Sequence, residues 1–184
     1  MGVEITACEI PDVLEIVSDV FRDERGYFSE FYNQNALAEL GFDHTFIQDN
    51  LSRSSRGVLR GLHYQLNPHA QGKLVRCIVG SVLDVVVDLR EGSDTFGKHV
   101  SRELAADRGN ALWIPPGFAH GFIALEGDSW VMYKCTSPWV PESERTIRYN
   151  DPDLNIKWPF DPSFIDQKDA EAPGFADAEK NFPL

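Results

Sequence analysis

The sequence predicts an all-β fold, an antiparallel barrel or jelly roll. Three observations support this class: short runs rich in Val, Ile and Leu recur along the chain, turns rich in Pro and Gly separate them, and little of the chain has helical spacing. At 184 residues and 42% hydrophobic content, the chain is long enough for one well-packed core. We therefore expect a single domain over residues 1–184.

The first part of the chain should form short strands and one helix. Residues 1–20 contain apolar runs suited to one or two edge strands. In residues 21–32, a turn at Asp23–Gly26 precedes aromatic strand formers. Residues 34–41 predict the helix, because their apolar side chains recur at helical spacing and a glycine ends the pattern.

The next strand, within residues 45–57, carries two amides on one face. Alternation places Gln48 and Asn50 on the same side as Phe46. Amides donate and accept hydrogen bonds without charge, which suits a polar ligand, but polar strand faces are also common in proteins without one. The alternation alone supports either interpretation.

Residues 58–90 hold the most informative pattern, because charged groups stand where a sheet is usually apolar. The chain between Lys73 and Arg90 is rich in Val, Leu and Ile and is broken at Gly80, which predicts two strands paired as a hairpin. Alternation places Lys73 on the same face as Val75. Lys73 is therefore expected to point inward.

A histidine occupies the strand before this predicted hairpin. His63 shares its face with Gly61 and Gln65, whereas strict alternation turns Arg60 to the other side. Glycine inside a strand often marks a bulge, so we expect Gly61 to re-aim either Arg60 or His63.

Two further titratable side chains are expected to point inward. Connections are predicted at residues 91–97 and 104–110, and a turn at Pro115–Gly117 precedes a strand on which His120 shares a face with phenylalanines. Tyr133 shares the inner face of the following strand with apolar neighbours. Taken singly, each of these two residues fits ordinary core packing as well as a site.

The last part of the chain is rich in proline and then acidic. Residues 136–160 end in a strand-like stretch at Ile156–Trp158. Residues 161–184 are too polar to form a core of their own. We expect this acidic C-terminal segment to pack back on the barrel.

Inward-facing residues of a barrel line its cavity, and here they would include His63, Lys73, His120 and Tyr133. The packing of an apolar core does not readily explain four titratable side chains on the inner face of one barrel. A neutral histidine can accept a proton, a tyrosine can donate one, and a desolvated lysine can stabilise an oxyanion. The set suits removal of a proton next to a carbonyl and its return from another direction, which inverts a stereocentre.

The composition limits which partners we expect the protein to bind and which cellular compartment we expect it to occupy. The formal charge of −12 and the pI near 4.7 argue against nucleic acid and against anionic membranes. The N-terminus has no signal-like pattern, and no run approaches the length of a membrane span. The three cysteines lack metal-ligand spacing. We expect free thiols, a cytoplasmic protein and no metal site.

Motifs run in order along nearly the whole chain: DERGYFSE (23–30), QDNLSRS (48–54), RGLHYQ (60–65), QGKLVR (71–76), VLDVVVDLR (82–90), IPPGFAHGF (114–122), YKCT (133–136), WPF (158–160) and KDA (168–170). Together they resemble the dTDP-4-dehydrorhamnose 3,5-epimerase family. The resemblance implies a cupin-like jelly roll, or double-stranded β-helix, with a few short helices. It also implies a cofactor-independent isomerase that binds a dTDP-sugar, forms a homodimer, and inverts C3 and C5 of dTDP-4-dehydro-6-deoxyglucose to give dTDP-4-dehydro-L-rhamnose.

The same resemblance implies a role for each matching residue. His63 is expected to act as general base, Tyr133 as general acid, Lys73 on the sugar C4 oxygen, and Asp169 as the acid that orients the base histidine. Trp139 stands where the family usually has a tyrosine that stacks on thymine. Arg25 and Glu30 could act in a neighbouring subunit. The expected substrate-binding residues are Phe21, Arg25, Glu30, Gln48, Asn50, Arg60, His120, Trp139, Glu144 and Lys168.

Other activities stay open on the residues alone. A C3-only epimerase or a keto-isomerase of a related nucleotide deoxysugar would use the same groups. A metal-dependent cupin needs a HxH pair, but the pair reads His63-Tyr64-Gln65 and so lacks one ligand. A non-catalytic cupin that binds sugar nucleotides would use the same histidine and tyrosine only as hydrogen-bonding groups.

Overall fold

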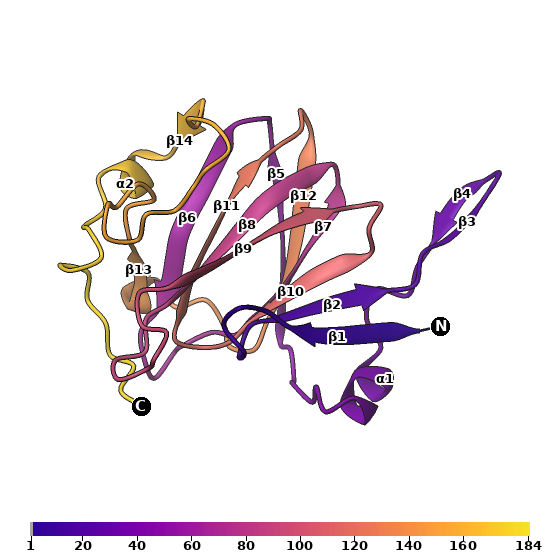
Figure 1. Ribbon diagram of the computed structural model, residues 1–184, viewed down its shortest axis with the longest axis horizontal. Helices are drawn as coiled ribbons and strands as arrows, with labels where there is room; N and C mark the ends of the chain where they lie inside the picture. The colour runs from indigo at the N-terminus through magenta and orange to yellow at the C-terminus, as the bar shows by residue number, and fades with distance from the viewer. Residues whose placement is uncertain (1) are drawn as a thin grey trace.

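Two antiparallel β-sheets face each other in a computed structural model that describes residues 2–184 (Figure 1). The first sheet has six strands in the order β1-β2-β10-β7-β12-β5. These strands are β1 (Val3–Ala7), β2 (Leu14–Ser18), β10 (Asn110–Ile114), β7 (Lys73–Val79), β12 (Ser129–Cys135) and β5 (Gln48–Ser54).

The second sheet has the order β13-β6-β11-β8-β9, with β14 added in parallel beside β6. Its strands are β13 (Glu144–Thr146), β6 (Val58–Gln65), β11 (Phe118–Ala124), β8 (Ser81–Asp88), β9 (His99–Ala105) and β14 (Phe164–Ile165). The helices α1 (Gln34–Glu39) and α2 (Gln167–Ala170) and the 3₁₀ turn η1 (Pro141–Ser143) lie outside the sheets. This architecture matches the predicted all-β fold with a few short helices.

A small hairpin projects away from the two sheets (Figure 1). It consists of β3 (Phe21–Asp23) and β4 (Gly26–Phe28), which pair with each other across the predicted turn. Its aromatic side chains are exposed, and Phe28 has 61% of its surface open to solvent. Exposed aromatic groups on a projecting element are typical of a surface that meets a partner.

The main core fills the space between the sheets. Val75, Cys77 and Val131 of the first sheet pack towards Val86 and Phe122 of the second, and each is at most 3% exposed. Burying a side chain of this size contributes roughly 1.5–3 kcal/mol. The inward faces predicted from alternation are therefore confirmed for β7, β11 and β12.

The helix α1 covers the outer face of the first sheet. Asn33 caps the helix by accepting a hydrogen bond from the backbone of its first turn. Leu37 and Phe42 then pack against Leu74 and Trp113 on the outside of the sheet. The helix predicted for residues 34–41 is confirmed.

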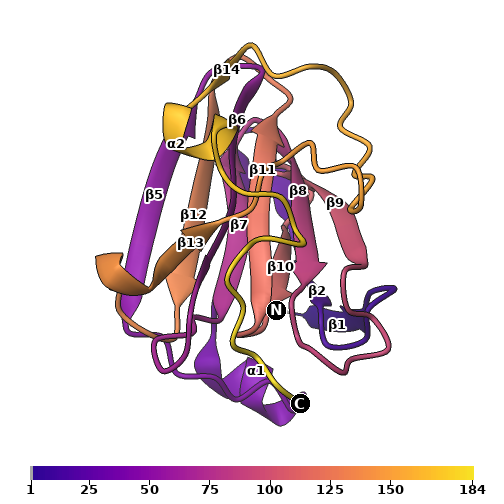
Figure 2. The same cartoon turned by 90° about the vertical axis from the view of Figure 1, so that its left-hand side faces the viewer.

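The C-terminal segment covers the outer face of the second sheet, as Figure 2 shows for the yellow part of the chain. Ala178 and Phe182 are buried against Leu62 and Tyr64 of β6. The Tyr64 hydroxyl also donates a hydrogen bond of 2.5 Å to the carbonyl of Glu179. The helix α2 lies beside β6, where Asp169 bonds to Gly61 and His63.

The predicted hairpin within residues 58–90 is wrong in its pairing. The two strands and the break at Gly80 are present, but β7 pairs with β10 and β12, whereas β8 pairs with β9 and β11. At Gly80, where φ is +70°, the chain passes from one sheet into the other. The alternation of apolar and polar residues along a strand predicts which face each side chain is on, but it does not predict which strand pairs with it.

Smaller differences concern the ends of elements. Ile156–Trp158 is not a strand, and Ile156 and Trp158 instead pack on the outer face of the second sheet. The connection predicted for 104–110 begins later, because β9 continues to Ala105. Among residues 2–184, no helix combines the length and the apolar composition needed to cross a membrane.

Candidate active site

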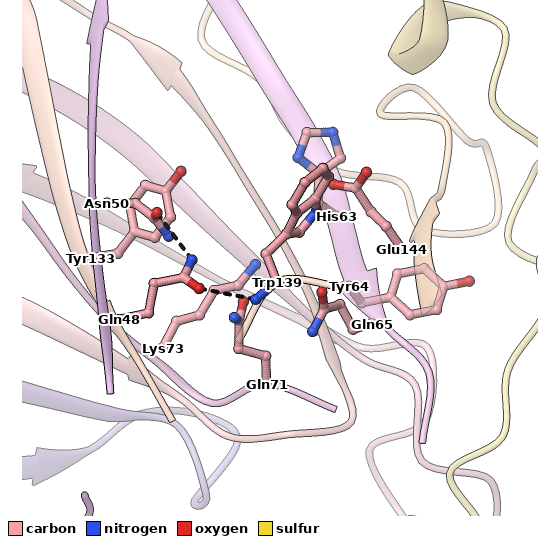
Figure 3. A pocket seen from close by; sticks show the side chains of 10 residues that line it. All are labelled: Gln48, Asn50, His63, Tyr64, Gln65, Gln71, Lys73, Tyr133, Trp139 and Glu144. Atoms are coloured by element: carbon pink, nitrogen blue, oxygen red, sulfur yellow. Dashed lines mark hydrogen bonds between the residues drawn. The ribbon is translucent and has the colours of Figure 1, made fainter. Parts of the chain in front are cut away.

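A cavity of about 340 Å³ opens between the two sheets. Strands β5, β7 and β12 line it from the first sheet, and β6 and the start of β13 line it from the second. Its lining residues, drawn in Figure 3, are Gln48, Asn50, His63, Tyr64, Gln65, Gln71, Lys73, Tyr133, Trp139 and Glu144.

A smaller cavity, of about 130 Å³, shares part of this lining. His63, Lys73 and Tyr133 line both cavities. The smaller cavity is lined by Ser52, Arg60, His63, Lys73, His120, Phe122 and Tyr133. A ligand that extends from one cavity to the other would therefore pass between an imidazole, an amine and a phenol.

His63 has a buried carboxylate behind it. Its Nε2 lies 2.6 Å from Oδ1 of Asp169 on α2, and the backbone N–H of Gly61 donates to Oδ2 of Asp169 at 3.0 Å. Asp169 is 3% exposed. Burial alone would raise the pKa of Asp169, but the hydrogen bonds from His63 and Gly61 hold that pKa below its ordinary value. The ionised carboxylate keeps a proton on Nε2 and leaves Nδ1 to accept one.

Lys73 and Tyr133 stand on neighbouring strands of the first sheet. Lys73 pairs with Cys135, and Tyr133 lies two residues before Cys135 on the same face of β12. Burial lowers the pKa of Lys73, while nearby negative groups, Asp84 among them, act in the opposite direction. Burial raises the pKa of Tyr133, so its hydroxyl stays protonated and can donate.

His63 and Tyr133 therefore face a ligand in the cavity from different sheets. Figure 3 shows His63 on one side of the cavity and Tyr133 on the other, with Lys73 between them in the view. A ring held in this space would meet His63 from the second sheet and Tyr133 from the first. Such an arrangement allows a proton to be removed from one face of a carbon and added to the other.

A second histidine lies next to His63 and is also paired with a carboxylate. His120 on β11 is the register partner of His63, and its Nε2 lies 2.8 Å from Oδ2 of Asp84 on β8. Burial lowers the pKa of His120 and raises that of Asp84. Burial thus favours the neutral form of both groups, and a neutral imidazole facing the smaller cavity suits a hydrogen bond to a ligand hydroxyl.

The predicted bulge at Gly61 is present. The pairing of β6 with β11 shifts between His63 and Arg60, and both residues line the smaller cavity. Gly61 has φ of +128°, and a Cβ there would lie 2.5 Å from Cα of Gly121. Glycine is therefore required for the bulge that brings Arg60 to the side of His63.

Four of the remaining predicted residues, Gln48, Asn50, Trp139 and Glu144, line the larger cavity, and a fifth, Lys168, is bonded to one of them. Lys168 Nζ forms an ion pair of 2.6 Å with Oε2 of Glu144. Gln48 Nε2 donates to Oδ1 of Asn50 at 3.1 Å, so these two amides lie together as the alternation predicted. Trp139 completes the wall and is 55% exposed.

Five predicted residues line neither cavity: Asp169 and Lys168 bond to residues that do, and the other three belong to the first part of the chain. Arg25 forms an ion pair of 2.5 Å with Asp23 in the projecting hairpin, which also carries Phe21. Glu30 accepts a hydrogen bond of 3.1 Å from Asn33. A binding role for Phe21, Arg25 and Glu30 therefore depends on a second chain, because the hairpin that begins this region points away from the sheets (Figure 1).

Sequence reasoning missed several residues around the site. Ser52 and Phe122 line the smaller cavity, and alternation from Asn50 and from His120 places each of them on the inner face. Asp84 is a carboxylate inside an otherwise apolar strand, which is a signal for a buried polar pair. Its Oδ1 has no hydrogen-bond partner within residues 2–184.

The donor set does not resemble a metal centre. Within the described part of the chain, no group of three or more His, Cys, Asp or Glu side chains is arranged to hold a metal ion. His63 and His120 are each bonded to a carboxylate through Nε2. At the position where a HxH pair would supply its second ligand, Gln65 uses its amide on backbone groups.

Fold and site together define a class of protein: a jelly-roll isomerase whose interior presents a histidine, a tyrosine and a lysine to one ligand. Comparison with known proteins shows the family within that class. The family model described as dTDP-4-dehydrorhamnose 3,5-epimerase matches residues 7–177, so the chain belongs to this family.

Relatives agree in sequence and in structure. The dTDP-4-dehydrorhamnose 3,5-epimerase of Pseudomonas aeruginosa is 52% identical over 176 residues, which are 95% of this chain and 97% of that protein. The dTDP-6-deoxy-D-glucose-3,5-epimerase of Legionella pneumophila, solved in complex with dTDP-4-keto-L-rhamnose, superposes with a TM-score of 0.90 at 44% identity over 95% of this chain and 94% of the other.

A third relative has a narrower activity in its name. ChmJ of Streptomyces bikiniensis, a 3'-monoepimerase solved with dTDP-quinovose, superposes with a TM-score of 0.86 at 34% identity over 92% of this chain and 87% of the other. The relatives confirm the predicted family, the cupin-like fold and the isomerase class.

Proposed function

We propose that this protein inverts C3 and C5 of dTDP-4-dehydro-6-deoxyglucose and yields dTDP-4-dehydro-L-rhamnose. One observation carries the proposal: His63, Lys73 and Tyr133 line both cavities, with the base and the acid on opposite sheets. The family and the relatives' names support the same substrate.

Each inversion consists of two proton transfers. His63 Nδ1 takes the proton from the carbon next to the ketone, and the electrons of the C–H bond move to the C4 oxygen. Lys73 stabilises the enolate that forms there. Tyr133 then protonates the carbon from the other side, after which solvent returns a proton to the phenolate and removes one from the imidazolium. A positioned acid or base typically accelerates such a step roughly 10²–10⁴-fold.

One cation can serve both inversions. C3 and C5 both flank the C4 ketone, so removal of a proton from either carbon places the negative charge on the same oxygen. The sugar ring must therefore present two carbons in turn to His63 while C4 stays near Lys73. Asp169 supports both steps, because it holds the proton on the far nitrogen of His63.

The rest of the substrate is an anion with an aromatic base. Trp139 offers a partly exposed π face to thymine, and the Arg60 guanidinium suits the diphosphate, where charged hydrogen bonds are strong. Gln48, Asn50, His120, Glu144 and Lys168 provide polar groups around the sugar and the phosphates. The epimerase of Bacillus anthracis, which is 38% identical, was solved with TDP and PPi bound, and this supports a thymidine diphosphate group in the ligand.

We infer that the working form is a homodimer in which each projecting hairpin reaches its partner. The exposed aromatic groups of β3 and β4 favour such a contact, and the contact would carry Phe21, Arg25 and Glu30 to a second chain. The three free cysteines fit the reducing cytoplasm in which we place the protein.

Incubation with dTDP-4-dehydro-6-deoxyglucose in deuterated water, followed by NMR, tests the proposal. Deuterium at both C3 and C5 is the expected result. Deuterium at C3 alone would instead assign the narrower activity of the Streptomyces bikiniensis relative, and deuterium at neither carbon would refute catalysis. His63→Ala should abolish exchange at both carbons while thymidine diphosphate still binds.

A further inference from the structure

The loop Ser137–Val140, which carries Trp139, is held by glutamine side chains. Gln71 Nε2 donates to the carbonyl of Ser137 at 2.6 Å, and Gln48 Oε1 accepts from the N–H of Trp139 at 3.0 Å. Gln65 holds the residues on either side of Trp139: its Nε2 donates to the carbonyl of Pro138 at 3.1 Å, and its Oε1 accepts from the N–H of Val140 at 2.7 Å.

Gln65 is the central member of this set. Its amide also donates to the carbonyl of His69 at 2.7 Å, so the two amide hydrogens and the oxygen are all engaged with backbone groups. The side chain is 5% exposed, and buried amides of this kind are costly unless they are hydrogen-bonded. Gln65 therefore ties the loop of Trp139 to the loop of His69 from inside the cavity.

Trp139 depends on this backbone attachment. Its side chain lines the larger cavity but is 55% exposed, so little of the indole is packed against the protein. A ring that is half open to solvent depends on the backbone that bears it for its position at the cavity. The hydrogen bonds to Pro138, Trp139 and Val140 therefore fix the backbone from which the indole reaches the cavity.

We propose that Gln65 is a positioning residue that holds Trp139 in place to stack on the aromatic base of the substrate. The inference rests on the proposed function for the identity of the base. This role accounts for the position of Gln65, two residues after His63 on the same face of β6. At that point the strand places an amide donor and acceptor within hydrogen-bond reach of the loop that carries Trp139.

The expected effect is on affinity and not on proton transfer. Stacking of one base on an aromatic side chain is equivalent to roughly a 5- to 150-fold change in affinity. Gln65→Leu should weaken binding of thymidine diphosphate about tenfold and raise KM for the dTDP-sugar similarly. The kcat should change less than about twofold, because Gln65 touches no group that transfers a proton.

A matched set of variants separates this role from a general loss of structure. Gln34→Leu is the control, since Gln34 is exposed at the start of α1, far from the cavity in sequence and on the outer side of the first sheet. Gln65→Glu keeps the acceptor for Val140 but removes the donors to Pro138 and His69, and it replaces Gln65→Leu if that variant does not fold. Thermal unfolding of each variant accompanies the binding measurement.

A double-mutant cycle with Trp139→Ala gives the deciding result. Titration calorimetry with thymidine diphosphate would measure both single variants and the double variant. If Gln65 acts through Trp139, the double variant binds no more weakly than Trp139→Ala alone. Additive losses, or thymidine diphosphate binding to Gln65→Leu as tightly as to the unaltered chain, would overturn the inference.

The failure of this inference is distinguishable from the failure of the proposed function. If the unaltered protein does not bind thymidine diphosphate, the assignment of the substrate falls and with it the role of Gln65. If the unaltered protein binds it and exchanges deuterium, but the cycle is additive, only the positioning role is refuted.

Discussion

Replacing Asp169 by asparagine tests the proposed role of His63 as base without changing a residue that lines either cavity. Asp169 lies behind His63, 2.6 Å from Nε2, and is 3% exposed. Asparagine has nearly the same shape but no charge, and its amide group can accept at only one atom. Either His63 or the backbone N–H of Gly61 would then lose its acceptor, because Asp169 now accepts from both.

The expected loss follows from the tautomer. Without the carboxylate, the proton is no longer held on Nε2, and the nitrogen that faces the sugar spends less time as the acceptor. We expect kcat to fall about 10²–10⁴-fold, the range for a positioned base that loses its orienting carboxylate. KM should change less than about threefold, since Asp169 lines neither cavity.

Solvent deuterium exchange into the dTDP-sugar, followed by NMR, measures this loss at C3 and C5 separately. Asp166→Asn is a matched control on the same helix, because asparagine also caps helices well and keeps the hydrogen bond to the N–H of Lys168. The reasoning is refuted if Asp169→Asn retains more than about a tenth of the exchange rate, or if the control loses as much activity as Asp169→Asn.

Other changes have equally definite outcomes. Lys73→Met should lower kcat roughly 10²–10³-fold with thymidine diphosphate binding retained, because the enolate loses its cation; calorimetry and exchange kinetics measure both. Burial lowers the pKa of Lys73, so kcat should fall with rising pH below the ordinary lysine value of about 10.4, and an alkaline limb that does not move to higher pH in Lys73→Arg would contradict this. Gly61→Ala should lower the free energy of unfolding by roughly 2–4 kcal/mol, because its Cβ would meet Cα of Gly121 at 2.5 Å and φ is +128°; urea denaturation measures this, with Gly127→Ala as the unstrained control. The pKa of Asp169 is lower in the folded than in the unfolded chain, so its stabilisation is complete above about pH 3.9 and is lost as pH falls through the folded value. The difference in unfolding free energy between the unaltered chain and Asp169→Asn should therefore shrink below about pH 4, and a difference independent of pH would count against stabilisation by an ionised Asp169.

Face assignment was the most successful part of the sequence reasoning. Lys73, Tyr133 and His120 point inward as alternation along their strands predicts, because a strand with one buried face tolerates no slip of a single residue. The bulge at Gly61 was also predictable, since glycine permits the positive φ that a bulge can require.

Strand partners and chain crossings were not predictable in the same way. The glycine at 80 is equally suited to a hairpin turn and to a corner between sheets, and only the packing of the whole barrel decides between them. Likewise, no local pattern brings Asp169 to His63, because the two lie 106 positions apart and their contact depends on the docking of the C-terminal segment. The family resemblance, and not periodicity, pointed to that pair.

Asp169 follows every strand of both sheets in the sequence, and this order has a consequence for how the protein becomes active. A ribosome releases the N-terminal residues first, so every strand of both sheets, β14 included, is synthesised before the helix that bears Asp169. The nascent chain therefore contains His63 before it contains the carboxylate of Asp169, which bonds to the imidazole. Cleavage between β14 and α2 would likewise remove the carboxylate from a chain that keeps the sequence of every strand.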